Sequence, residues 1–113
     1  MSIKPIPKKI LIHTVTYEEW VEGDGITTED GFKAPVTLSN VRVQHVSDLT
    51  VNTNNKELKY DAILFFDMKN SKASGKFTFV EESKITFEGK EMFIQKVDPV
   101  YAFELHHYEL GLV

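Results

Sequence analysis

The sequence predicts an all-β fold: a small single-domain barrel or sandwich of about six or seven mainly antiparallel strands with long loops. Aromatic residues make up 12% of the chain, a bias that favours strands. Apolar residues alternate or occur in short runs, and helical spacing never persists beyond two turns. Turn-forming residues separate these runs, as in small barrels. We therefore expect at most one short helix, at residues 17–21.

The expected strands follow one another along one domain, residues 1–113, because this length supports a single core. An extended N-terminal arm, residues 1–9, leads into a strand at 9–17. A second strand covers 36–46, and its alternation slips at Ser39-Asn40, which predicts a bulge. A third strand covers 58–68. Strands 84–87 and 91–96 form a hairpin with Gly89 at positive φ. Asp98-Pro99 is expected to break the chain before a last strand, 102–112.

Composition excludes several function classes. Thirteen Lys and Arg against seventeen Asp and Glu give a formal charge of −4, and no basic face that would grip nucleic acid through its phosphates is visible. The chain has no cysteine, which removes disulfides, thiol catalysis and Cys-ligated zinc. The apolar run Ile10–Ile12 is too short for a signal peptide or a membrane span, so no membrane association is expected.

Side chains that carry chemistry are present but lack a productive pattern. His106 and His107 are adjacent, so on a strand they should point to opposite faces, and His13 and His45 lie in other strands. No nucleophile elbow, phosphate loop or dinucleotide fingerprint occurs. We expect no catalytic, metal-binding or cofactor-binding residues, no cofactor and no enzymatic activity. Phe77 and Phe79 are interpreted as core residues and not as a base-stacking surface.

Two polar segments are the candidate contact sites. Residues 18–33 hold six acids and three glycines, and residues 46–57 are polar with Asn54-Asn55 at their tip. Either segment is suited to contact a neighbouring subunit or to face a channel. The candidate loop residues are Glu18, Glu19, Glu22, Asp24, Glu29, Asp30, Asn52, Asn54 and Asn55. The arm adds the candidate contacts Lys4, Lys8 and Lys9, which would meet acidic residues of a neighbour.

Four stretches carry a resemblance to a known family. They are Ile6–Tyr17 (IPKKILIHTVTY), Pro35–Val43 (PVTLSNVRV), Ala62–Ser71 (AILFFDMKNS) and Ser83–Tyr108 (SKITFEGKEMFIQKVDPVYAFELHHY). Their order and extent resemble the minor capsid proteins of tailed phages, in particular the stopper, or head-completion, type of head–tail connector protein. The match covers nearly the whole chain, although none of the patterns is chemically diagnostic.

The resemblance implies a structural virion protein of the phage neck. Such a protein assembles into a homo-oligomeric ring, six-fold or twelve-fold, that closes the DNA-filled head and joins it to the tail. Its implied partners are portal and adaptor proteins on the head side and tail-terminator or tail proteins on the other. Genomic DNA passes close by without sequence-specific binding, and assembly takes place in the host cytoplasm. The alternatives are a tail-terminator or adaptor ring of the same neck, or a stand-alone β-barrel module that binds a peptide or oligonucleotide.

Overall fold

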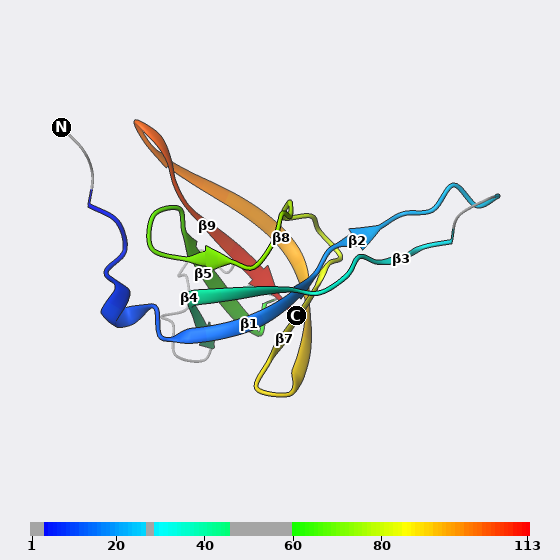
Figure 1. The fold of residues 1–113 in the computed structure, drawn as a ribbon, viewed down its shortest axis with the longest axis horizontal. Coiled ribbons are helices and arrows are strands. Elements are labelled where there is room, and N and C mark those ends of the chain that lie inside the picture. Colours follow the sequence, from blue (N-terminus) through cyan, green and yellow to red (C-terminus); the bar gives the residue numbers. More distant parts are fainter. Residues whose placement is uncertain (1–3, 27–28, 46–59) are drawn as a thin grey trace, which may run out of the picture.

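A computed structural model describes residues 4–26, 29–45 and 60–113 (Figure 1). Nearly all of its regular structure is strand, together with one short 3-10 turn. In chain order the elements are η1 (Lys8–Ile10), β1 (His13–Glu18), β2 (Trp20–Val21), β3 (Gly31–Phe32), β4 (Val36–His45), β5 (Ala62–Asp67), β6 (Lys72–Ala73), β7 (Lys84–Phe87), β8 (Lys90–Ala102) and β9 (Glu104–Leu112).

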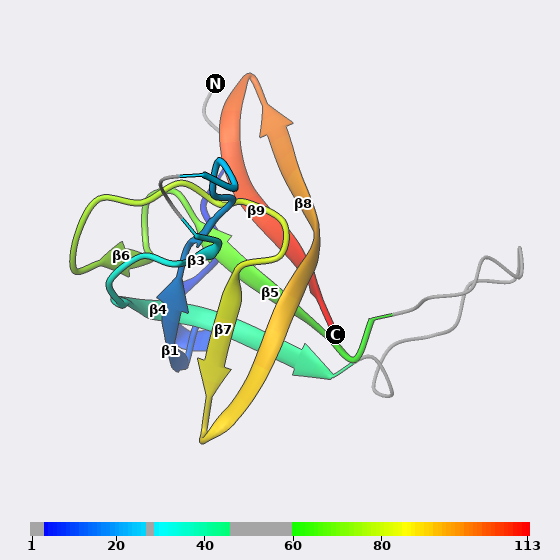
Figure 2. The ribbon, with the colours of Figure 1, turned by 90° about the vertical axis from the view of Figure 1, so that its right-hand side faces the viewer.

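Six strands close into an antiparallel barrel, which confirms the predicted fold class and selects the barrel over the sandwich. The order β1-β7-β8-β9-β5-β4 returns to β1 through a β1–β4 pairing, and short β6 adds to β4. Figure 2 shows these strands wrapped around the barrel interior. Because the sheet closes on itself, the main strands leave few free edges for uncontrolled pairing.

The barrel interior is filled by apolar side chains from all six strands. Alternation along β1 directs Val15 and Tyr17 inward and leaves Thr14 exposed. The buried core consists of Val15, Tyr17, Leu38, Val41, Val43, Ala62, Leu64, Phe66, Ile85, Phe87, Met92, Ile94, Leu110 and Leu112. This packed interior supports a rigid scaffold on which the remaining segments are mounted.

A bulge in β4 confirms the predicted slip at Ser39-Asn40. Val15 pairs with Leu38 but His13 pairs with Val41, so β4 has one residue more than β1 between these pairs. Asn40 takes up the extra residue at φ 54°, a conformation that asparagine adopts more readily than most residues. The bulge lets the inward-facing residues on both sides of it enter the same core.

The β7–β8 turn also follows the sequence prediction. Phe87 pairs with Lys90 across a two-residue loop in which both Glu88 and Gly89 have positive φ, 50° and 81°. Two such residues in succession are characteristic of the type I′ turn, whose twist matches that of antiparallel strands. Gly89 is needed here because glycine readily adopts positive φ. A side chain would not clash, since nothing lies within 4 Å of the position that a Cβ would take.

The structure corrects the predicted chain break at Asp98-Pro99. β8 continues through it to Ala102, and Pro99 pairs with Tyr108 of β9. β7 pairs with β8 only up to Phe93, so in the described part of the chain Pro99 lies where the other edge of β8 has no partner strand. A missing N–H is tolerated at such an edge. The arm is likewise not extended throughout, because Lys8–Ile10 form η1. Residues 17–21, where the sequence allows at most a short helix, belong mainly to β1 and β2.

Residues 77–80 close one side of the barrel without forming a strand. The rings of Phe77 and Phe79 pack edge-to-face on Tyr17 and Phe66, with centroids 5.4–5.7 Å apart. The Tyr17 hydroxyl donates to the Thr78 carbonyl at 2.6 Å and accepts the Val80 N–H at 3.1 Å. Phe77 and Phe79 are therefore core residues, as predicted.

Candidate assembly surfaces

The first surface is a two-stranded ribbon, described over residues 20–26 and 29–32, that extends beyond the barrel at the right-hand end of Figure 1. Its strands β2 and β3 pair through Trp20–Phe32 and Val21–Gly31. Its base is firmly attached: the Trp20 N–H donates to Ser83 Oγ at 2.9 Å, and the Trp20 and Phe32 rings pack 5.3 Å apart. The Lys84 ammonium lies 4.9 Å from the centre of the Phe32 ring. The ribbon is thus anchored to the barrel by packing and hydrogen bonds.

Glu18 and Glu19, the first two candidate loop acids, belong to this base and not to an exposed loop. Glu18 ends β1 and lies 3.6 Å from the Lys84 ammonium. Glu19 accepts the Thr78 N–H at 2.9 Å and forms an ion pair with Lys33, also at 2.9 Å. Partial burial opposes ionisation of Glu19, but the Thr78 hydrogen bond and the Lys33 charge outweigh it and lower the pKa of its carboxyl. Both side chains are structural.

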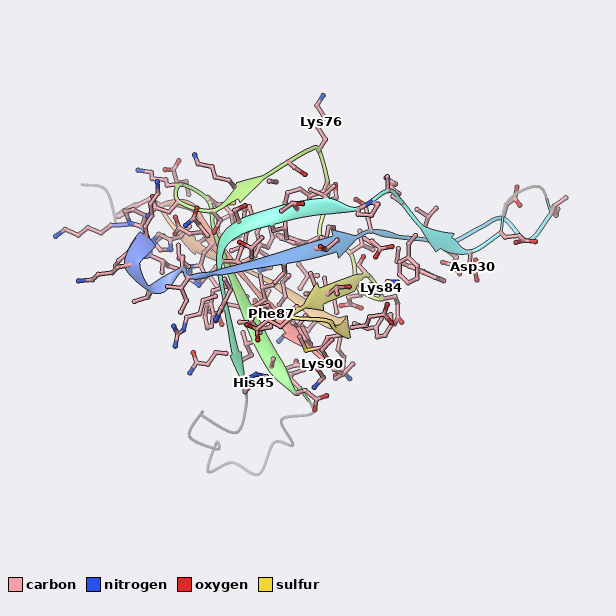
Figure 3. The ribbon with its side chains drawn as sticks, turned by 60° about the horizontal axis from the view of Figure 1, so that its bottom comes forward. Asp30, His45, Lys76, Lys84, Phe87 and Lys90 are labelled. Atoms are coloured by element: carbon pink, nitrogen blue, oxygen red, sulfur yellow. The ribbon has the colours of Figure 1, made fainter. Side chains whose placement is uncertain are left out.

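The other four acids of the segment lie exposed on the ribbon itself: Glu22, Asp24, Glu29 and Asp30. Asp30 Oδ1 accepts the Gly23 N–H at 2.7 Å, and Asp24 Oδ1 accepts the Ile26 N–H at 2.7 Å. Figure 3 shows Asp30 far out on the ribbon and Lys84 nearer the barrel. Ile26 is 90% exposed between these acids. The outer part of the ribbon therefore presents a strongly exposed apolar side chain among carboxylates.

The second surface is the tip of the β8–β9 hairpin, which rises above the barrel in Figure 2. Tyr101 is 68% exposed and Phe103 is 88% exposed. Phe103 has φ 69°, a conformation that is unusual for a bulky side chain and that often accompanies a functional constraint. Large aromatic side chains are the commonest anchors of protein–protein contacts. The tip has the composition of such an anchor.

The third surface is the N-terminal arm, whose described residues lie along the subunit's own barrel. The Ile6 N–H donates to Asp67 Oδ1 at 3.0 Å, and Asn70 Nδ2 donates to the Ile6 carbonyl at 2.7 Å. His106 Nε2 donates to the Lys4 carbonyl at 2.8 Å. The Asp67 side chain is fully buried and also accepts the Asn70 N–H. These hydrogen bonds fix the arm to the ends of β5 and β9.

The basic side chains of the arm remain exposed although its backbone is held. Lys4, Lys8 and Lys9 are all exposed, the last two on η1. The arm is therefore a positively charged surface of the subunit, and its contacts with a neighbour stay a prediction.

The candidate loop residues Asn52, Asn54 and Asn55 lie outside the described residues.

Beside the arm lies a cleft of about 320 Å³. Its lining is mostly apolar, with Ile6, Ile10 and Leu11 on the arm side and Phe65 on β5. Arg42 borders it and donates from Nη1 to the Ile10 carbonyl at 3.4 Å. The cleft is open to solvent, and Ile10 is 41% exposed.

The adjacent histidines correct one sequence expectation, because their rings meet. The two Nδ1 atoms of His106 and His107 lie 2.8 Å apart, and His107 Nε2 donates to Glu109 Oε2 at 2.9 Å. Strand alternation sets the direction of the Cβ atoms, but in the irregular outer part of β9 the rings turn towards each other. Across the residues that the structure describes, no cluster of three or more His, Cys, Asp or Glu side chains is placed to hold a metal ion.

His13 has a structural role in the barrel wall. Its Nδ1 accepts the Val43 N–H at 2.9 Å, and its ring packs edge-on against Phe87. Burial, with smaller contributions from Arg42 and His45, lowers the pKa of the His13 ring despite an opposing effect of Glu88. The neutral ring therefore acts as a hydrogen-bond acceptor in the native fold.

Sequence reasoning missed the hairpin tip and the buried Asp67. The Asp98-Pro99 pair was interpreted as a break, which hid the fact that β8 and β9 form one long hairpin. A signal is available in the run Val100–Phe103, because its Val, Tyr and Phe residues favour a strand that continues after the proline. Asp67 follows five apolar residues, and a buried carboxylate at a strand end is a recurrent way to accept backbone N–H groups.

These features define a small β-barrel protein with projecting segments. The chain belongs to the minor capsid protein family, whose sequence profile matches residues 7–112. It is therefore a structural component of a phage virion, as the resemblance implied. Comparisons with curated proteins and with solved structures found no significant match. No helix in the described ranges is long and apolar enough to cross a membrane.

Proposed function

We propose that this protein forms a ring in the neck of a tailed phage, where it closes the DNA-filled head and joins it to the tail. The role is mechanical and not catalytic. It requires a rigid body, a contact to neighbouring copies, and contacts to the rings above and below. The proposal rests on family membership together with the distribution of exposed apolar residues over the projecting segments.

The observation that carries the proposal is that, among the described residues, the two most exposed large apolar side chains of a well-packed barrel lie on projections. Phe103 and Ile26 are 88% and 90% exposed, at the ends of two separate hairpin-like segments. Residues of this kind at rigid, projecting positions are typical of surfaces that become buried on assembly. Two separate projections allow two different contacts, one to a neighbouring copy in the same ring and one to an adjacent ring. A ring subunit that lies between other rings needs both.

The aromatic tip of the β8–β9 hairpin is suited to contact a neighbouring ring of different composition, a portal or adaptor protein on one side or a tail protein on the other. The hairpin tip continues β8 and β9 beyond the barrel, and the ribbon continues the line of β1 and β4 in a different direction (Figures 1 and 2). The formal charge of −4 is also compatible with a passage that DNA crosses without being retained, since like charges repel.

Deletion of the gene from its phage, followed by electron microscopy of the particles, tests the proposal. A head-closing neck protein predicts full-length free tails beside heads that package DNA and then lose it. Heads that retain DNA and fail only to attach tails would instead favour the tail-terminator position. Infectious virions with intact necks would contradict the neck role. Supply of the intact gene in trans is the control, and it must restore normal particles.

A further inference from the structure

The two ends of the molecule's long axis carry opposite charge. The ribbon lies at one end, and the N-terminal arm with η1 lies at the other (Figure 1). Residues 20–32 contain four acids and no Lys or Arg. Residues 4–11 contain three lysines and no Asp or Glu. The longest extent of the molecule is 48 Å, so a subunit cannot bring its own two ends together.

The same two ends also carry complementary apolar features. Ile26 projects from the ribbon with 90% of its surface exposed. The cleft of about 320 Å³ beside the arm is lined by Ile6, Ile10, Leu11 and Phe65 and is bordered by Arg42. The ribbon end thus presents an exposed apolar side chain among carboxylates, and the arm end presents an open apolar cleft beside ammonium and guanidinium groups. The two ends are therefore complementary in both charge and polarity.

We propose that the ribbon of one subunit docks on the arm and cleft of a second copy of this chain. Ile26 enters the cleft, and the ribbon acids face Lys8, Lys9 and Arg42 of the neighbour. This inference rests on the proposed ring and specifies the contact that builds it. Because the two contact patches are different, the contact is head-to-tail, and its repetition with a constant rotation closes a ring.

The anchoring of both patches favours this contact energetically. The ribbon base is held by Trp20, Phe32 and Lys84, and the arm is held by its hydrogen bonds to Asp67, Asn70 and His106. Both patches are therefore already ordered before docking, so the complex loses little conformational entropy when it forms. One ribbon end is nevertheless small compared with a typical stable interface, about 800 Å² per partner. Ring closure and the neighbouring rings then supply the cooperativity that one contact lacks.

Cysteine cross-linking tests the contact, because the native chain has no cysteine. The variant Ile26→Cys/Ile10→Cys is supplied in trans to the deletion phage, and purified virions are oxidised and analysed on denaturing gels. Both positions are exposed, so folding should be unaffected. The proposal predicts a ladder of covalent oligomers up to ring size. A dimer without higher species would show a reciprocal contact and would overturn the head-to-tail arrangement.

The matched control is Ile26→Cys/Lys90→Cys, which places the second thiol on the exposed β7–β8 turn, and it should give monomer only. Virions that contain the Ile26→Cys/Ile10→Cys protein and show no ladder would overturn the ribbon–arm contact while leaving the neck role intact. Intact virions that lack the protein altogether would instead contradict the neck role. The two failures are therefore distinguishable.

Charge exchange gives an independent test. Glu22→Lys/Glu29→Lys replaces two ribbon acids by bases and cancels the net charge of the ribbon, and Lys8→Glu/Lys9→Glu replaces two arm bases by acids and makes the arm net negative. Each pair alone places like charges together and should lower the yield of infectious particles by roughly tenfold or more. The four changes together should restore most of the yield. Equal loss in the single-sided and combined variants, with normal thermal stability of each protein, would overturn the proposal.

Discussion

Replacement of Phe103 by asparagine separates the stability of the subunit from its assembly. Phe103 is 88% exposed, so the substitution removes only about an eighth of the side chain's possible burial. Full burial of a phenylalanine contributes about 1.5–3 kcal/mol, and the loss here is a few tenths. A left-handed backbone costs most residues roughly 1–2 kcal/mol, and asparagine adopts it far more readily. The isolated subunit should be unchanged or up to about 1 kcal/mol more stable.

Assembly should respond in the opposite direction. Loss of a central aromatic anchor typically costs about 2 kcal/mol or more per contact, which is a factor of about thirty in affinity. We therefore expect Phe103→Asn to keep or raise the melting temperature, by up to about 4–8 °C, and to reduce complementation of the deletion phage. Thermal denaturation and plaque counts with the same protein measure the two effects.

Glu88→Asn is the matched control, because Glu88 is also exposed and also has positive φ, but at the β7–β8 turn. It should show the same relief of backbone strain and normal complementation. Two results would refute the reasoning. If Phe103→Asn lost more than about 1 kcal/mol, the tip would be part of the subunit's own packing. If it complemented normally, the aromatic tip would not be a contact.

Three further substitutions test the barrel itself. Tyr17→Phe should lower the free energy of unfolding by about 1–3 kcal/mol, because the buried hydroxyl joins three hydrogen-bond partners; an unchanged urea midpoint would contradict this. Gly111→Ala should destabilise by about 1–3 kcal/mol, because a Cβ would lie 2.6 Å from the Tyr60 ring, and adding Tyr60→Ala should remove the clash. Because the pKa of His13 is lower in the folded protein than in the unfolded chain, the unfolded chain binds more protons near pH 6. The contribution of His13 to the free energy of unfolding is therefore fully present above about pH 6.5, and it is lost as the pH decreases towards the folded-state pKa. His13→Gln should reduce this loss between pH 7.5 and 5.5 in urea unfolding; an identical pH dependence in both proteins would exclude His13 as its source.

The elements that sequence predicted correctly are those fixed by local chemistry. The β7–β8 turn depends on Gly89, and the β4 bulge depends on the break in alternation at Ser39-Asn40. Each of these signals lies within a few residues, so no knowledge of partner strands was needed.

The missed features depend on which strands become neighbours. Pro99 is compatible with a strand only because β8 has a free edge at that point, and this follows from the length of β7. The sequence prediction groups Glu18 and Glu19 with the loop acids, but the pairing of β1 with β7 brings Lys84 beside Glu18, and the pairing within the ribbon brings Lys33 beside Glu19. The cleft beside the arm likewise arises from residues of four separate segments, which no local pattern could bring together.

A localised cryo-electron microscopy reconstruction of the virion neck tests the central claim most directly. The account predicts a ring of barrels of this topology between the portal side and the tail, with each ribbon directed at the arm of the next subunit. Barrel density found only on the capsid shell or along the tail, with none in the neck, would contradict it.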